Sequence, residues 1–127
     1  MMKVVCGIIY NGDKILLCRR SPNKHLAGFW EFPGGKIELN EKPECGLIRE
    51  LDEELSISVK KLNYYTTVIH EYENFTIQLI AYKCIFIETE IKLLDHDRYE
   101  WMELNNILDK NLAPADIPIV NKLNENF

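Results

Sequence analysis

Residues 35–57 read GKIELNEKPECGLIRELDEELSI, and the order of apolar and charged residues in this stretch predicts one amphipathic helix. A proline suits the first position of a helix, because its missing N–H group has no helical partner there. Three leucines then recur at every fourth residue and form a stripe that faces the core: Leu47, Leu51 and Leu55. The helix is therefore predicted to run from Pro43 to Leu55.

A second face of the same helix carries three carboxylates: Glu50, Glu53 and Glu54. Spacings of three and four residues bring such side chains within about 5–6 Å of one another. Like charges this close repel, and a protein tolerates the repulsion where a cation neutralises it. The pattern indicates a site for a divalent metal ion, and the alternative interpretation is a solvated acidic face.

The whole stretch resembles the signature of the Nudix hydrolases, G-x5-E-x7-R-E-U-x-E-E-x-G-U, in which U is apolar. The chain matches it at every defined position but one: Gly35, Glu41, Arg49, Glu50, Leu51, Glu53, Glu54 and Ile57. Ser56 stands where the family has glycine, which suits a helix end that turns into the left-handed region. Serine there is expected to cost about 1 kcal/mol and to leave every presumed metal ligand in place.

The resemblance implies a Mg²⁺ or Mn²⁺ site. Its ligands would be Glu50, Glu53, Glu54, the backbone carbonyl of Gly34, and Asp95. Oxygen ligands suit Mg²⁺, which keeps several waters and bridges to substrate phosphates. Asp95 precedes Trp101 by six residues, where close relatives often place a glutamate that reaches the metal, and a solvent-exposed loop aspartate is the alternative.

The resemblance also implies how the site works. Arg49 would orient the glutamates, and Glu41 would support the loop–helix junction next to the Gly35 turn. Bound metal would reduce the charge of the substrate phosphates so that a water molecule attacks one phosphorus. A carboxylate near that water would act as general base, and Glu50 is expected in this role with Glu53 as the alternative.

Similarity to MutT-type nucleotide pyrophosphohydrolases extends over nearly the whole chain, in LLCRRSPNKHLAGFWEFPGGKIE, YEWMEL and APADIP. It implies that Arg20 points at the phosphates, a role that suits a guanidinium group. Glu31 and Phe32 would line the nucleotide site, and His25 lies in the matching loop. The alternatives are a surface arginine, a core phenylalanine and a solvated loop histidine.

The same comparison makes Asp116 the residue expected to read the base. MutT-like enzymes selective for 8-oxoguanine carry asparagine at this place, and an amide both donates and accepts hydrogen bonds. An ionised carboxylate only accepts, which favours an exocyclic amino group such as cytosine N4. A protonated Asp116, or contact with the N7–H of 8-oxoguanine, would restore the guanine preference. A helix cap is the non-functional alternative.

The expected function is therefore a Mg²⁺-dependent pyrophosphohydrolase that cleaves a nucleoside triphosphate to the monophosphate and pyrophosphate. A CTP or dCTP-type or oxidised nucleotide is the expected small-molecule substrate, with 8-oxo-dGTP hydrolysis of the MutT type as the alternative. A Nudix-like domain that binds nucleotide without turnover is the rival of a different class. Such domains usually lose a glutamate of the signature, and this chain retains them all.

Composition and charge limit which other classes of protein the sequence can represent. The 127 residues predict a single domain over positions 1–127, and the net charge of −5 argues against a nucleic-acid polymer as partner. The apolar run from Val4 to Tyr10 is too short for a membrane span. Four scattered cysteines indicate buried free thiols in a reducing cytoplasm: Cys6, Cys18, Cys45 and Cys84. Monomer and dimer both stay open.

The remaining segments predict an α/β fold with a mixed sheet, and the resemblance implies a Nudix α/β/α sandwich. Apolar runs predict strands, the first two joined by the turn 11–13: Lys3–Tyr10, Lys14–Arg20, Phe29–Phe32, Lys61–Tyr72, Phe75–Glu88 and Arg98–Leu104. Residues 21–28 are predicted to be a loop, and Pro33–Gly35 a turn. A terminal helix is predicted over Asp116–Asn124, with Pro118 in its first turn.

Overall fold

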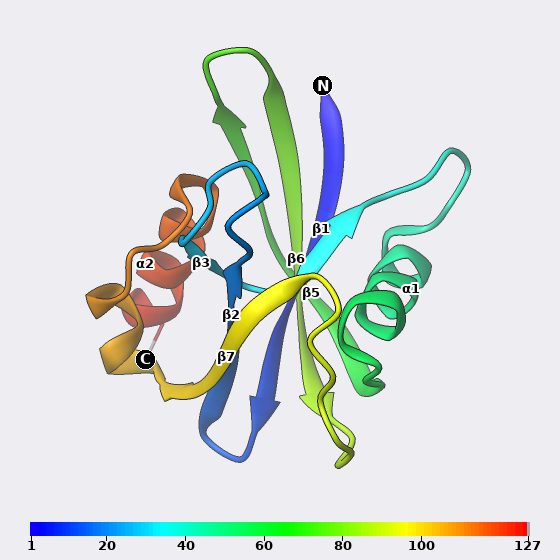
Figure 1. The fold of residues 1–127 in the computed structure, drawn as a ribbon, viewed down its shortest axis with the longest axis vertical. Coiled ribbons are helices and arrows are strands. Elements are labelled where there is room, and N and C mark those ends of the chain that lie inside the picture. The colour runs from blue at the N-terminus through cyan, green and yellow to red at the C-terminus, as the bar shows by residue number, and fades with distance from the viewer. Residues whose placement is uncertain (127) are drawn as a thin grey trace.

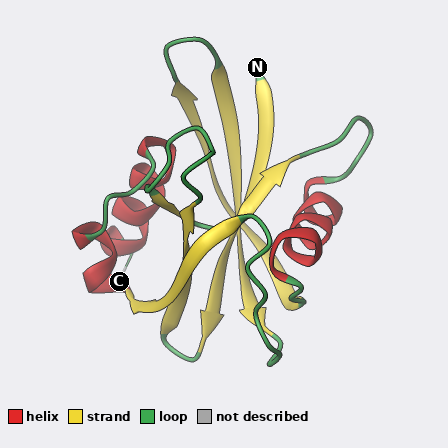
Figure 2. Cartoon of the chain, viewed as in Figure 1, coloured by secondary structure: helices red, strands yellow, loops and turns green. Residues whose placement is uncertain are grey.

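A mixed sheet of seven strands lies between helices on its two sides in the computed structural model, which describes residues 1–126 (Figures 1 and 2). The strands are β1 (Met2–Asn11), β2 (Lys14–Arg20), β3 (Trp30–Glu31), β4 (Gly34–Lys36), β5 (Val59–Glu71), β6 (Thr76–Phe86) and β7 (His96–Glu103). The helices are α1 (Pro43–Leu55) and α2 (Ile117–Glu125), with 3₁₀ segments η1 (Leu104–Asp109) and η2 (Pro114–Asp116) before α2. The predicted α/β class is confirmed.

The strand order is β3-β2-β1-β6-β5, with β4 added beside β1 and β7 beside β2. Strands β1 and β6 run parallel and the other pairs of strands are antiparallel, while Trp30 forms an isolated parallel bridge with Leu112. The predicted hairpin between the first two strands is confirmed, because Tyr10 pairs with Ile15 across the turn. The sheet is therefore mixed, as predicted.

Two hydrophobic clusters lie on opposite faces of the sheet, because successive side chains of a strand point to opposite faces. Val5 and Ile9 of β1 pack in the cluster that contains the α1 leucines, whereas Cys6 and Ile8 pack in the cluster that contains α2. Leu47, Leu51 and Leu55 are at most 1% exposed. The predicted bounds of α1 and its buried stripe are both confirmed.

The segment after Pro33 differs from the prediction. Residues 34–36 form strand β4 rather than a turn, and Gly35 pairs with Val5 of β1. A Cβ atom at Gly34 would collide with the carbonyl oxygen of Val5, and one at Gly35 would collide with the Glu50 carboxylate. Close packing against backbone thus requires glycine at position 34, whereas a side chain at position 35 would displace the end of the Glu50 side chain; neither glycine has a positive φ.

Smaller differences occur elsewhere. Strand β7 begins at His96, two residues before the predicted start, because residues 96–98 extend the pairing with β2. The terminal helix begins at Ile117, after the η2 turn, and Pro118 lies in its first turn as predicted. Cys45 is exposed, unlike the other three cysteines, so the expectation of a buried thiol is wrong for this residue. Among the described residues 1–126, no helix has the length and apolar character needed to span a membrane.

Helix α1 ends at Ser56 in the left-handed conformation, with φ 55° and ψ 38°, as the family's glycine position predicted. Because a side chain costs about 1–2 kcal/mol in this region, Ser56→Gly is expected to raise the free energy of unfolding by about 1 kcal/mol. Urea denaturation measures the change. The matched control is Ser58→Gly, where φ is not positive and added chain entropy should destabilise the fold. Equal effects of the two substitutions would contradict this explanation.

Candidate metal and nucleotide site

A cleft of about 750 Å³ runs beside the N-terminal half of β1 and is lined by residues of β1, β3, β4, α1 and the β5–β6 hairpin. Charged side chains line one part of it, among them Glu50, Glu54 and Asp95, and apolar side chains line another, among them Ile77 and Leu79. A metal ion suits the first kind of surface, and an aromatic base suits the second.

Arg49 is the most heavily bonded side chain at the charged part of the cleft. Its Nε donates to Glu41 Oε2 at 2.8 Å, and its Nη1 donates to Glu50 Oε1 at 2.9 Å and to Glu53 Oε2 at 3.2 Å. Its Nη2 donates to the carbonyl of Lys36 and to the other oxygen of Glu41. One guanidinium therefore joins helix α1 to strand β4 and to the loop between them.

Glu41 accepts a further hydrogen bond from the backbone N–H of Glu38, at 2.9 Å. The bonds from Arg49 and from this N–H lower the pKa of Glu41 to about 2. The carboxylate is thus fixed in its charged form at the junction between loop and helix.

Glu50 and Glu54 are brought together at the wall of the cleft, with side chains 13% and 18% exposed. Burial, and next the Glu50 carboxylate beside it, raise the pKa of Glu54 to about 9. Two facing carboxylates that resist double ionisation are a donor set that a divalent cation would stabilise. This pair therefore fits a metal ion with oxygen ligands.

Glu53 is not part of this pair. Its side chain is 57% exposed and turned to Arg49. Within residues 1–126 no three carboxylate, histidine or cysteine side chains already surround a common point in the way that a metal ion requires. Gly34 lines the cleft next to Gly35. Of the expected ligands, the structure thus brings Glu50 and Glu54 together and leaves Glu53 on the rim.

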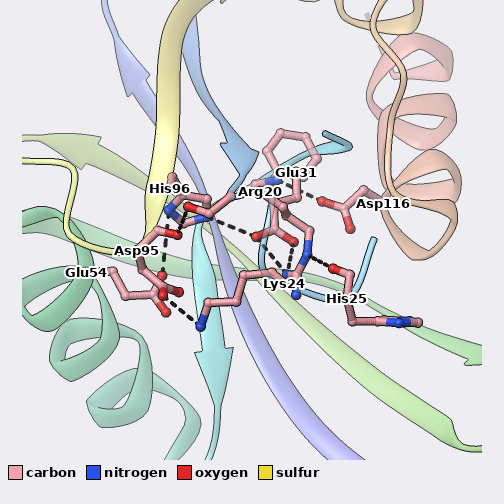
Figure 3. Close-up of polar contacts among 10 residues, drawn as sticks. Arg20, Lys24, His25, Glu31, Glu54, Asp95, His96 and Asp116 are labelled. Atoms are coloured by element: carbon pink, nitrogen blue, oxygen red, sulfur yellow. Dashed lines mark hydrogen bonds and ion pairs between the residues drawn. The ribbon is translucent and has the colours of Figure 1, made fainter. Parts of the chain in front are cut away.

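Arg20 and Glu31 form an ion pair near the middle of the cleft (Figure 3). Arg20 Nη1 donates to both Glu31 oxygens, at 3.0 and 3.2 Å, and its Nε donates to the carbonyl of His25. The His25 ring lies edge-on to Tyr72 and Phe75, with centroids 5.8 and 5.7 Å away. Three of the five residues expected around the nucleotide, Arg20, Glu31 and His25, therefore meet at one place.

His96 joins this group, and sequence reasoning missed it. Its side chain is 3% exposed, and its Nε2 lies 3.0 Å from Glu31 Oε2. Its Nδ1 lies 4.0 Å from Glu54 Oε2 and has no hydrogen-bond partner among the described residues. A single histidine in a charged segment has no characteristic spacing to other site residues. Its position directly after Asp95, an expected site residue, was the one signal that could have identified it.

Asp116 lies across the cleft from Glu54 (Figure 3). Its Oδ2 accepts a hydrogen bond from the backbone N–H of Phe32 at 2.8 Å, and it makes no helix-cap bond. The helix-cap interpretation is therefore wrong. Burial, and next the Glu31 charge, raise the pKa of Asp116 well above its usual range. Phe32 is 2% exposed, so its ring packs in the core while it also lines the cleft.

Asp95 is bonded by two residues of the loop between β2 and β3. Lys24 Nζ lies 2.7 Å from Asp95 Oδ1, and Ser21 Oγ donates to the Asp95 carbonyl at 2.7 Å. The side chain of Asp95 is 36% exposed and lies on the Glu54 side of the cleft (Figure 3). Asp95 is thus neither isolated nor fully solvated.

Known proteins are similar to this chain in sequence and in fold. A family model for the NUDIX domain matches residues 4–122. The CTP pyrophosphohydrolase of Escherichia coli K12 is 36% identical over 120 residues, which cover 94% of this chain and 89% of the relative. The 8-oxo-dGTP diphosphatase of the same organism is 32% identical over 123 residues, covering 96% and 95%. The crystal structure of a MutT protein from Methanosarcina mazei Go1 superposes with a TM-score of 0.89 at 27% identity, covering 98% and 94%.

The low pKa of Glu41 predicts a pH dependence of stability. A carboxylate whose pKa is depressed on folding stabilises the folded state above its ordinary pKa of 4.5, and this contribution is lost as the pH falls toward about 2. Glu41→Gln should therefore lower the urea midpoint at neutral pH, and the difference from wild type should vanish between about pH 4.5 and 2. Glu90→Gln, in an exposed loop, is the control. A difference that persists at pH 2 would refute the assignment.

Proposed function

The chain belongs to the Nudix hydrolase family, and we propose that it is a Mg²⁺-dependent pyrophosphohydrolase for cytosine or oxidised nucleoside triphosphates. The observation that carries the proposal is the close pair Glu50 and Glu54 beside Gly35, in the same cleft as Arg20. The named activities of the two Escherichia coli relatives support the substrate class.

Metal binding is assigned to Glu50, Glu53 and Glu54, together with the Gly34 carbonyl and Asp95. Oxygen donors of this kind suit Mg²⁺, and Mn²⁺ is the natural substitute. The bound ion would reduce the negative charge of the phosphates. Glu53 has a 57% exposed side chain, so it can turn from Arg49 into the site at little cost.

The protein's own groups carry the remaining steps. Arg20 binds the phosphates, a role that suits its planar fork of donors. The oxygen of a water molecule bonds to one phosphorus while the bridging P–O bond breaks and pyrophosphate leaves. A carboxylate takes the proton of that water, and Glu50 is proposed for this role with Glu53 as the alternative. Arg49 holds Glu50 in place through a hydrogen bond, and its bond to Glu53 is the one that is released when Glu53 turns to the metal.

Base selection is assigned to Asp116, with Phe32 and His25 as further contacts. Ionised Asp116 accepts only, and so favours the cytosine amino group. Protonated Asp116 both donates and accepts, and so suits the O6 and N7–H of 8-oxoguanine. The raised pKa of Asp116 is the specific observation that keeps 8-oxo-dGTP hydrolysis as the second candidate function.

Pyrophosphate release over a panel of nucleotides tests the proposal. CTP, dCTP, dGTP and 8-oxo-dGTP are compared by kcat/KM with Mg²⁺, and the monophosphate product is measured alongside. Equal amounts of monophosphate and pyrophosphate are expected, and chelation of the metal should abolish both. Tight nucleotide binding without product would instead favour a non-catalytic binding domain.

Glu50→Gln is expected to lower kcat at least about 100-fold, because it removes a proposed ligand and general base without changing side-chain volume. Asp52→Asn is the control, because Asp52 is an exposed carboxylate of the same helix. Circular dichroism checks that both variants fold. More than a tenth of wild-type kcat in Glu50→Gln would exclude the role given to Glu50.

The preference between bases should depend on pH. The groups that face Asp116 are the Phe32 N–H, Glu31, Arg20, Tyr72 and Cys6. As the pH rises through the pKa of Asp116, the carboxyl loses its donor, so the ratio of kcat/KM for CTP to that for 8-oxo-dGTP should rise. Asp116→Asn should make the ratio independent of pH and shift it toward 8-oxo-dGTP. A wild-type ratio that does not rise with pH would contradict this reading.

A further inference from the structure

Lys24 lies in the loop between β2 and β3 and lines the cleft at its charged part. Its ammonium group is 2.7 Å from Asp95, and the two side chains are 42% and 36% exposed (Figure 3). No other ion pair of Lys24 occurs among the described residues. An exposed pair of this kind is weak, so Lys24 can exchange its partner at little cost.

The two arginines near the cleft are held more firmly. Arg49 makes hydrogen bonds to three glutamates and to one backbone carbonyl. Arg20 bonds both oxygens of Glu31 and the carbonyl of His25. Lys24 combines a flexible four-carbon stem with a single exposed partner, Asp95, so it is better able than either arginine to follow a ligand.

The balance of charges in the cleft favours a lysine that can change its partner. Five carboxyl groups line it, against three basic side chains: Glu31, Glu50, Glu54, Asp95 and Asp116, against Arg20, Lys24 and Lys36. A triphosphate that enters adds further negative charge. If Asp95 gives up its Lys24 partner, its carboxylate therefore needs another cation. The substrate phosphates in turn need a positive group nearby.

We propose that Lys24 is a specificity-determining residue that pairs with Asp95 in the absence of ligand and moves to the terminal phosphates of the substrate. The inference rests on the proposed function, because it assumes a triphosphate and a cation at Asp95. Lys24 is then a competitor of the metal ion for Asp95 and a partner of the β- and γ-phosphates. A monophosphate offers it no new contact.

The competition with the metal is tested without nucleotide. Removing the charge in Lys24→Gln should tighten Mn²⁺ binding about three- to fivefold, measured by electron paramagnetic resonance of free Mn²⁺. Lys60→Gln, an exposed lysine of β5 outside the cleft, is the matched control and should bind Mn²⁺ like wild type. Equal or weaker Mn²⁺ binding by Lys24→Gln would overturn the proposal.

The partnership with phosphate is tested with the triphosphate that the wild type hydrolyses best. Lys24→Gln should raise its KM about fivefold and leave kcat within about twofold, while the inhibition constant of the matching monophosphate stays unchanged. Lys24→Arg should keep the wild-type KM, because it keeps the charge. Equal weakening of triphosphate and monophosphate would show that the loop was merely damaged, and would overturn the proposal.

The two measurements separate this inference from the function on which it rests. If no nucleotide is hydrolysed, the proposed function fails, and the Mn²⁺ comparison still decides whether Lys24 competes for the acidic site. If hydrolysis occurs but Mn²⁺ affinity does not respond to Lys24→Gln, the proposed function stands and the inference fails.

Discussion

The contact of β4 with both β1 and α1 is the constraint on which the site depends. Gly34 lies so close to the carbonyl of Val5 that the position has no room for a side chain, and a side chain at Gly35 would displace the Glu50 carboxylate. Arg49 then joins α1 to the Lys36 carbonyl, just beyond these glycines. Together these contacts fix the helix against the strand, and Glu50 and Glu54 face the cleft as a result.

The local pattern of residues was sufficient to predict helix α1, which buries a regular stripe of apolar side chains. The bounds of α1 followed from Pro43 and three leucines, and its left-handed end at Ser56 followed from the family's glycine position. Strand β4 was not predictable in this way, because Pro33-Gly34-Gly35 has the composition of a turn. Its strand geometry comes from pairing with β1, which lies about thirty residues earlier in the chain, and sequence composition does not record that partner.

The residues of the site were likewise predictable only where they follow a local spacing along the chain. Spacing along one helix indicated Glu50, Glu53 and Glu54, but which of them face each other depends on the bonds that Arg49 makes. His96 carried no spacing signal, because its partners Glu31 and Glu54 come from a different strand and a helix. Residues that act through contacts across the sheet are therefore the ones that sequence reasoning leaves out.

Base preference depends on charge balance as much as on residue identity. Asp116 can donate a hydrogen bond, as asparagine can, only while it is protonated, and its ionisation is opposed by burial and by Glu31. Arg20 is bonded to Glu31, and it reduces the effect of that charge on Asp116. If Arg20 binds the substrate phosphates as proposed, Glu31 would lose part of its compensation, and the pKa of Asp116 would rise further. On this proposal the groups that bind phosphate influence base selection, so the residue at position 116 would not determine the substrate by itself.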